Sequence, residues 1–121
     1  CGLMLKTVRI GSNEYNMKSS AYTPLKYKMD YGTDLLKDIG RLNKLNDDIS
    51  RLKTKAEKEE AWMSEFSGFL EMAYRIAYVM ITEYDPGFKS YEDWLKGIDN
   101  VFSNENWILE VMECAMSTFR R

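Results

Sequence analysis

The sequence predicts a mainly α-helical protein, a small domain of about five helices that follows a short N-terminal β-hairpin. Along most of the 121 residues, apolar side chains recur at steps of three and four, the spacing of one helix face. Capping and helix-ending residues separate these segments. Alternating β-prone runs occur only before residue 20. The length suits one modest core, so we treat residues 1–121 as a single domain.

The first predicted element is a β-hairpin over residues 5–20. Two alternating runs, 6–10 and 14–18, flank the turn residues Gly11-Ser12-Asn13. An isolated hairpin is marginal in water, so we expect it to pack on the helices or to pair with another chain. Residues 1–3 precede Met4. We expect Met4 to be the natural start and residues 1–3 to be an added remnant.

Two short helices are predicted within residues 24–45. The first has Thr23 as its N-cap, Pro24 in its first turn and Gly32 at its C-cap. The second begins at Thr33-Asp34 and carries an apolar stripe of Leu35, Leu36, Ile39, Leu42 and Leu45. Polar residues dominate 46–60, which we expect to be an exposed connector or a frayed approach to the next helix.

A central helix is predicted over residues 57–84, overlapping the connector and ending at Asp85-Pro86-Gly87. Apolar residues extend nearly all round it, so it must be mostly covered. We expect one side to face the domain's own core and the other to meet copies of the chain or a client protein.

Two C-terminal helices are predicted within residues 90–119. Ser90 caps the first, with Asp93 in a capping-box position. Ser103 caps the second, which runs from Asn104 to about Phe119. Its apolar stripe is Trp107, Ile108, Val111, Met112, Ala115 and Phe119, with Met116 beside it.

Charge is unevenly distributed along the chain, although the net charge is only −2. Residues 1–58 carry twelve Lys/Arg and seven Asp/Glu, net +5, and residues 59–121 carry five and twelve, net −7. Solvated faces of a helical bundle, head-to-tail attraction between subunits, and two partners of opposite charge are all compatible with this pattern.

Residues for catalysis or metal binding are lacking in the sequence. There is no His, and the only cysteines are Cys1 and Cys114, so a metal cluster of credible spacing is excluded. Cys114, within an apolar helical pattern, predicts a buried thiol. We found neither a Gly-rich phosphate loop nor a recognisable carboxylate pair. We therefore expect no catalytic, cofactor-binding or metal-binding residues, and a protein that is not an enzyme.

The sequence also predicts neither a signal peptide nor a membrane partner. The best apolar run, residues 66–81, is shorter than the roughly 20 residues that a bilayer requires. It also contains Glu71 and Arg75, an i,i+4 pair suited to a water-facing stripe. We expect a cytoplasmic protein.

Eight methionines and sixteen aromatic residues give this chain an adaptable apolar surface. Most of these side chains fill the core, and the excess predicts contacts with other copies, in a homo-oligomer, or with a client. The predicted partner-binding residues are Trp62, Phe66, Phe69, Met72, Ile76, Met80, Trp107, Met112 and Met116.

Two stretches carry a resemblance to a known family. Residues 23–39, TPLKYKMDYGTDLLKDI, follow a hairpin of the form VRIGSNEYNM, and residues 84–95, YDPGFKSYEDWL, follow the long apolar segment. This order resembles the tail assembly chaperones of long, non-contractile-tailed phages (siphophages) and of prophages in Gram-positive bacteria. The resemblance covers residues 5–119, whereas 43–60 match nothing in particular.

The resemblance implies a protein that binds the tape measure protein, which is largely apolar helix, and keeps it soluble. Such chaperones recruit tail tube subunits and leave as the tube polymerises. They therefore act in the host cytoplasm and are absent from the mature virion. In many relatives a frameshift appends a second domain. The family offers no catalytic residues and no binding motif to transfer.

Two alternatives remain at this stage: a structural virion component such as a head–tail connector, and a helical DNA-binding regulator. Thr33 to Arg51 could be read as a helix-turn-helix, but the acidic pI and the lack of a basic recognition helix oppose it. In residues 43–60 acids interleave with bases and no aromatic residue is available to stack on bases until Trp62. We therefore expect no nucleic acid partner.

Overall fold

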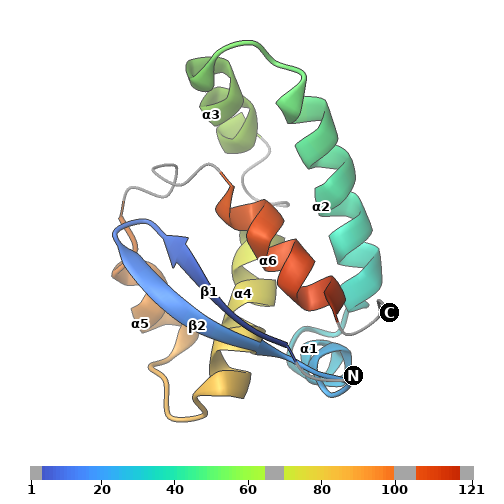
Figure 1. The fold of residues 1–121 in the computed structure, drawn as a ribbon, viewed down its shortest axis with the longest axis vertical. Coiled ribbons are helices and arrows are strands. Elements are labelled where there is room, and N and C mark those ends of the chain that lie inside the picture. The colour runs from blue at the N-terminus through green and yellow to red at the C-terminus, as the bar shows by residue number, and fades with distance from the viewer. Residues whose placement is uncertain (1–3, 65–69, 100–105, 118–121) are drawn as a thin grey trace.

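Six helices follow a two-stranded hairpin in the computed structural model, which describes residues 4–64, 70–99 and 106–117 (Figure 1). This confirms the predicted fold class. The strands are β1 (Met4–Ile10) and β2 (Asn13–Ser19). The helices are α1 (Thr23–Tyr31), α2 (Leu35–Ser50), α3 (Lys55–Ser64), α4 (Glu71–Tyr84), α5 (Tyr91–Lys96) and α6 (Trp107–Met116).

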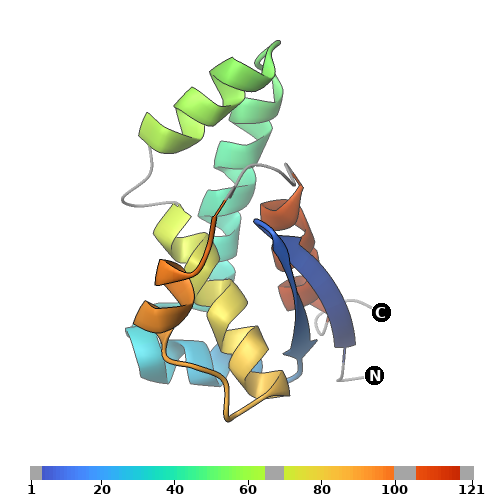
Figure 2. The same ribbon diagram turned by 90° about the vertical axis from the view of Figure 1, so that its left-hand side faces the viewer.

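The hairpin lies against the chain's own helices. Its strands pair antiparallel with Ile10 opposite Asn13, which leaves a two-residue turn at Gly11 and Ser12. Alternate side chains point to one face, where Val8, Ile10 and Met17 are fully buried. Because β2 contacts α4 and β1 contacts α6, this face closes one side of the core (Figure 2).

Two of the four predicted ends of α1 and α2 are confirmed. Gly32 ends α1 in the left-handed conformation, and Asp34 caps α2 by accepting the N–H groups of Leu36 and Lys37. The N-cap role of Thr23 is wrong. Thr23 is buried inside the first turn of α1, and its hydroxyl donates to Glu83 Oε1 of α4 at 2.6 Å.

The polar segment 46–60 is helical, contrary to the predicted exposed connector. Helix α2 continues to Ser50 and α3 begins at Lys55, so α2 is not a short helix and the connection is only residues 51–54. The reason is a small apolar contact between the two helices: Ile49 is buried, and Leu52 and Ala61 pack against the same core. Figures 1 and 2 show α3 and the end of α2 rising from the rest of the molecule.

The predicted central helix 57–84 is two helices in the described chain. Helix α3 ends at Ser64, α4 begins at Glu71, and the two run in different directions in Figure 2. Residues 65–69 lie outside the described residues. Helix α4 contacts β2, α1, α2 and α6, so the core is built around it. Eight of its fourteen residues are buried, and the expectation of an apolar side left open for partners is wrong within 71–84.

The C-terminal elements follow the predicted signals where the structure describes them. Helix α4 stops at Asp85, whose carboxylate accepts the N–H of Gly87. Ser90 caps α5 by accepting the N–H of Asp93. Helix α6 covers the centre of the last predicted helix, and its predicted ends at Ser103 and Phe119 fall outside the described residues.

Aromatic side chains join α4, α5 and α6. The ring of Tyr74 stacks on Trp107 with centroids 5.5 Å apart and meets Trp94 edge-on at 6.0 Å. Tyr78 and Tyr91 pack against the same tryptophan. Much of the aromatic excess therefore fills the interior. In the ranges that the structure covers, no helix combines the length and apolarity needed to cross a bilayer.

Candidate functional site

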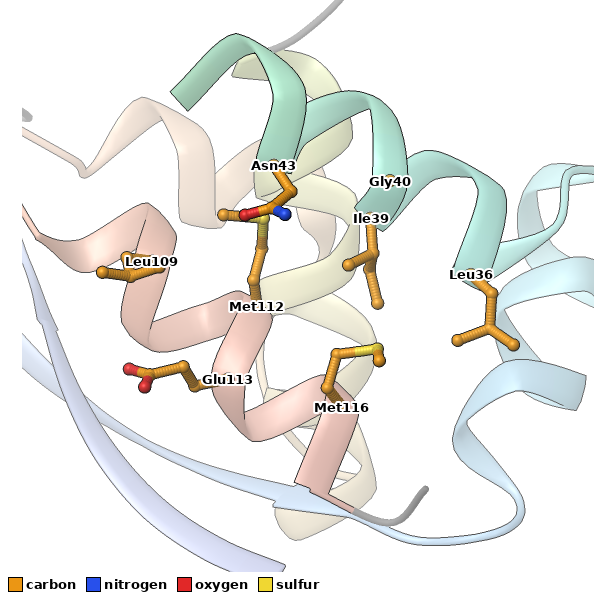
Figure 3. A pocket seen from close by; sticks show the side chains of 8 residues that line it. All are labelled: Leu36, Ile39, Gly40, Asn43, Leu109, Met112, Glu113 and Met116. Carbon is orange, nitrogen blue, oxygen red and sulfur yellow. The ribbon is translucent and has the colours of Figure 1, made fainter. Parts of the chain in front are cut away.

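A groove of about 350 Å³ lies between α2 and α6, and it is the candidate binding site (Figure 3). Its lining is mostly apolar, with one amide and one carboxylate: Leu36, Ile39, Gly40, Asn43, Leu109, Met112, Glu113 and Met116. Ile39 and Met112 are buried, whereas Leu36 and Leu109 are 46% and 38% exposed. Exposed apolar side chains gathered along a groove indicate a surface for another protein.

The two walls of the groove are matching helical rows. On α6, Leu109, Met112 and Met116 follow at steps of three and four, and on α2 Leu36, Gly40 and Asn43 do the same. Each row spans eight residues, and the seven steps from its first residue to its last cover about 10 Å of helix. The groove therefore suits about two turns of a third helix laid between α2 and α6.

Gly40 leaves room in the α2 wall. A Cβ atom at this position would meet nothing within 4 Å. A glycine in a helix interior costs roughly 0.5–1 kcal/mol relative to alanine. Helix α2 thus carries a destabilising residue at the point where a side chain would narrow the groove.

The edges of the groove carry opposite charges. Glu113 belongs to the α6 wall and is half exposed, with Lys6 Nζ 3.9 Å from its carboxylate. On α2, three exposed bases each follow a lining residue directly in the sequence and so lie on the outer side of the helix: Lys37, Arg41 and Lys44. A partner can therefore meet negative charge at one edge and positive charge at the other.

The structure distributes the nine predicted partner-binding residues among different environments. Met112 and Met116 line the groove. Four others are buried in the core: Met72, Ile76, Met80 and Trp107. Phe66, Phe69 and the side chain of Trp62 lie outside the described residues. The buried four share the helical spacing of the groove residues, which is why the pattern does not separate the two groups.

Six groove residues were not among the predicted site residues: Leu36, Ile39, Gly40, Asn43, Leu109 and Glu113. A signal for two of them is present in the sequence. Leu36 follows the buried Leu35, and Leu109 follows the buried Ile108, so the apolar arc of each helix is wider than its core contact requires.

A second cavity, of about 390 Å³, lies beside α1 and is lined by Tyr22, Lys26, Thr82, Glu83 and Pro86. Its carboxylate is already used, because Glu83 accepts hydrogen bonds from the hydroxyls of Ser20 at 2.5 Å and Thr23 at 2.6 Å. Lys26 is likewise paired with Asp30 at 3.0 Å. These contacts hold the start of α1 on α4.

Among the residues that the structure describes, Asp38 is the charged side chain that is buried. Its Oδ2 accepts the hydroxyls of Tyr27 at 2.7 Å and Thr33 at 2.6 Å, and Arg41 lies 3.8 Å from Oδ1. Burial, and then the hydrogen bond to Asp38, raise the pKa of Tyr27. The partners of Asp38 come from α1, α2 and the turn between them, so this network holds the two helices together.

The thiol of Cys114 is buried, as predicted, and burial raises its pKa from 9.0 to about 11. It therefore stays protonated and unreactive at neutral pH. In the parts of the chain that the structure describes, no three His, Cys, Asp or Glu side chains gather to hold a metal ion.

Comparison with protein-family models, curated proteins and solved structures finds no match to this chain. The helix-turn-helix considered for Thr33–Arg51 is not formed, because α2 runs without a break from Leu35 to Ser50. The groove between α2 and α6 is thus the site whose geometry favours a particular kind of partner, an apolar helix.

Proposed function

We propose that the protein is a tail assembly chaperone that holds apolar helical turns of the tape measure protein in the α2–α6 groove. The groove is the observation that carries this proposal, because its lining is mostly apolar and its length suits about two turns of a helix. The sequence resemblance of residues 23–39 and 84–95 to this family supports the choice of client.

The lining of the groove suits a client whose sequence varies along its length. Met112 and Met116 are flexible and polarisable, so one groove can accommodate different apolar side chains. A contact of two helical turns is small and each copy binds weakly. A long helical client compensates by offering many such turns to many copies. The copies would keep the client soluble in the host cytoplasm, recruit tail tube subunits and leave as the tube polymerises.

The test is co-expression with the tape measure protein of the same phage or prophage, using two substitutions at Gly40. Gly40→Trp fills the groove from a position where nothing lies within 4 Å of the added Cβ. Gly40→Ala is the matched control and leaves most of the space. We expect wild type and Gly40→Ala to form a soluble complex with the client, and Gly40→Trp to lose it with unchanged helical content by circular dichroism.

Two results would count against the proposal. If Gly40→Trp co-purifies with the client as wild type does, the groove is not the site. If wild type and the tape measure protein are both soluble and never associate, the chaperone function itself is wrong.

Mass spectrometry of purified mature virions separates this function from that of a head–tail connector. A chaperone that leaves during assembly is absent from the particle, whereas a connector is present in every particle.

A further inference from the structure

Helix α1 and the residue before it carry an exposed apolar stripe, which we call the α1 stripe: Tyr22, Leu25 and Met29. These side chains are 50%, 62% and 68% exposed. They follow at steps of three and four on the side of α1 opposite to Tyr27, which is buried against the core. Figures 1 and 2 show α1 lying across the end of the molecule that is remote from α3.

Charged side chains flank the α1 stripe on both sides. Lys28 and Asp30 are both exposed and lie on either side of Met29, each about 100° round the helix from it. Asp30 pairs at 3.0 Å with Lys26, which lies on the same side of the helix and nearer to the stripe. The stripe therefore has a basic edge at Lys28, and its other edge carries an ion pair without net charge.

The α1 stripe and the α2–α6 groove are complementary in spacing and in charge. The stripe and the Leu109-Met112-Met116 row both repeat at i, i+3 and i+7, so a helix presenting the first can lie along the second. The basic edge of α1 matches Glu113 on one wall, and the edge with the Lys26–Asp30 pair adds no net charge beside the bases on α2.

We propose that α1 of one copy lies in the α2–α6 groove of the next copy, with Lys28 beside Glu113 and the Lys26–Asp30 pair toward α2. Turning α1 end for end would move Lys28 from Glu113 to the α2 edge, beside the bases Lys37 and Lys44. The contact therefore specifies one direction of α1 in the groove.

The proposed contact is heterologous, because the stripe and the groove are different surfaces of one chain. Such a contact links copies head to tail and either closes a ring or continues as a filament. Its charges agree with the division of the sequence, since α1 belongs to the half with net charge +5 and the Glu113 wall to the half with net charge −7.

One consequence rests on the proposed function. If the client also binds this groove, a neighbouring α1 covers the groove until a client helix displaces it. Free copies would then cover one another's apolar surface, and binding of a client would replace self-association.

Sedimentation velocity over a range of concentrations tests the contact with two full-length variants. Met29→Asp removes the stripe and leaves the groove, whereas Gly40→Trp fills the groove and leaves the stripe. We expect wild type to associate beyond dimers and each variant alone to stay monomeric. A one-to-one mixture should form a dimer that does not grow, because only one stripe and one groove remain usable.

Two controls guard this result against general effects of substitution. Gly40→Ala leaves most of the groove, and Leu5→Asp changes a side chain of β1 that is 58% exposed and lies outside both surfaces. Both should associate as wild type does. A monomeric wild type at every concentration, a mixture that forms no dimer, or an equal loss in Leu5→Asp overturns the proposal.

Charge exchange tests the pairing itself. Lys28→Glu and Glu113→Lys should each weaken self-association about tenfold, and the two together in one chain should restore it. If the double exchange does not restore self-association, Lys28 and Glu113 do not contact each other. Met29→Asp should still co-purify with the tape measure protein, so a failure of self-association and a failure of client binding remain separate results.

Discussion

Gly11 is the position where one methyl group should change the stability of the fold most directly. It has φ +67°, and a Cβ there would lie 1.9 Å from the carbonyl oxygen of Asp99. Gly11→Ala should therefore lower the free energy of unfolding by about 3 kcal/mol, from the backbone conformation and the steric clash together.

Gly32 provides the matched control for Gly11. Its φ is +73°, but nothing lies within 4 Å of an added Cβ. Gly32→Ala should lower the free energy of unfolding only by the cost of the left-handed backbone conformation, about 1 kcal/mol. Urea unfolding followed by circular dichroism measures both variants. Equal losses would mean that the hairpin turn does not press against the segment after α5.

Asp38 should contribute more stability than any surface carboxylate of α2. Asp38→Ala leaves the hydroxyls of Tyr27 and Thr33 without their acceptor in a site that is 3% exposed. We expect a loss of about 3 kcal/mol in urea unfolding. Asp48→Ala removes a surface ion pair in which the Asp48 carboxylate lies 4.0 Å from Arg51. This change should lower the free energy of unfolding by less than about 0.5 kcal/mol. Similar losses of stability in the two variants would contradict a stabilising hydrogen-bond network around Asp38.

At the scale of elements, the start of α3 is held by a capping box. The Oγ1 of Thr54 accepts the N–H of Glu57 at 3.1 Å, and the carboxylate of Glu57 accepts the N–H of Thr54 at 3.1 Å. The spacing Thr-x-x-Glu is visible in the sequence, but the surrounding charges conceal it within a segment that resembles a polar connector.

Thr54→Ala should destabilise α3 by about 1 kcal/mol and leave the other helices unchanged. Hydrogen exchange measures this, because amides of α3 should exchange faster while those of α5 keep their rates. Ser90→Ala, which removes the cap of α5, should give the opposite pattern. Faster exchange throughout the chain in either variant would show that these caps are not local.

Helix ends were predicted better than helix lengths, and the reason is physical. The caps at Gly32, Asp34 and Ser90 depend on a few neighbouring residues, so the local sequence specifies them. The extension of α2 to Ser50 depends on its contact with α3, which a local pattern does not reveal. Thr23 failed as a cap for the same reason, because Glu83 lies sixty residues away.

At the scale of the whole molecule, buried and partly buried tyrosines should make stability sensitive to alkaline pH. Burial raises the pKa of five of them above 10.0, that of Tyr74 to about 12: Tyr27, Tyr31, Tyr74, Tyr78 and Tyr91. In the unfolded chain these groups lose their protons near pH 10.0, while the folded protein keeps them. Stability is therefore unaffected below that pH and falls as pH rises above it.

Urea unfolding at neutral pH and at successive values above pH 10 measures this dependence. The free energy of unfolding should be constant at first and then decrease, and the tyrosinate absorbance of the folded protein should lag behind that of the unfolded chain. Tyr74→Phe removes one of the titrating hydroxyls, so the free energy of unfolding should decrease less steeply with pH. A stability that does not change as pH passes 10 would contradict the burial of these hydroxyls.

The sequence by itself determined the fold class, the hairpin, several helix ends, the buried Cys114 and the charge difference between the two halves. Each of these depends on periodicity, composition or a short motif. Only the tertiary structure decided which apolar side chains stay accessible. Met80 and Met116 both lie on apolar helical stripes, yet Met80 is fully buried while Met116 is only partly buried and lines the groove. Accessibility depends on which helices pack together, and that is set by contacts between residues far apart in the chain.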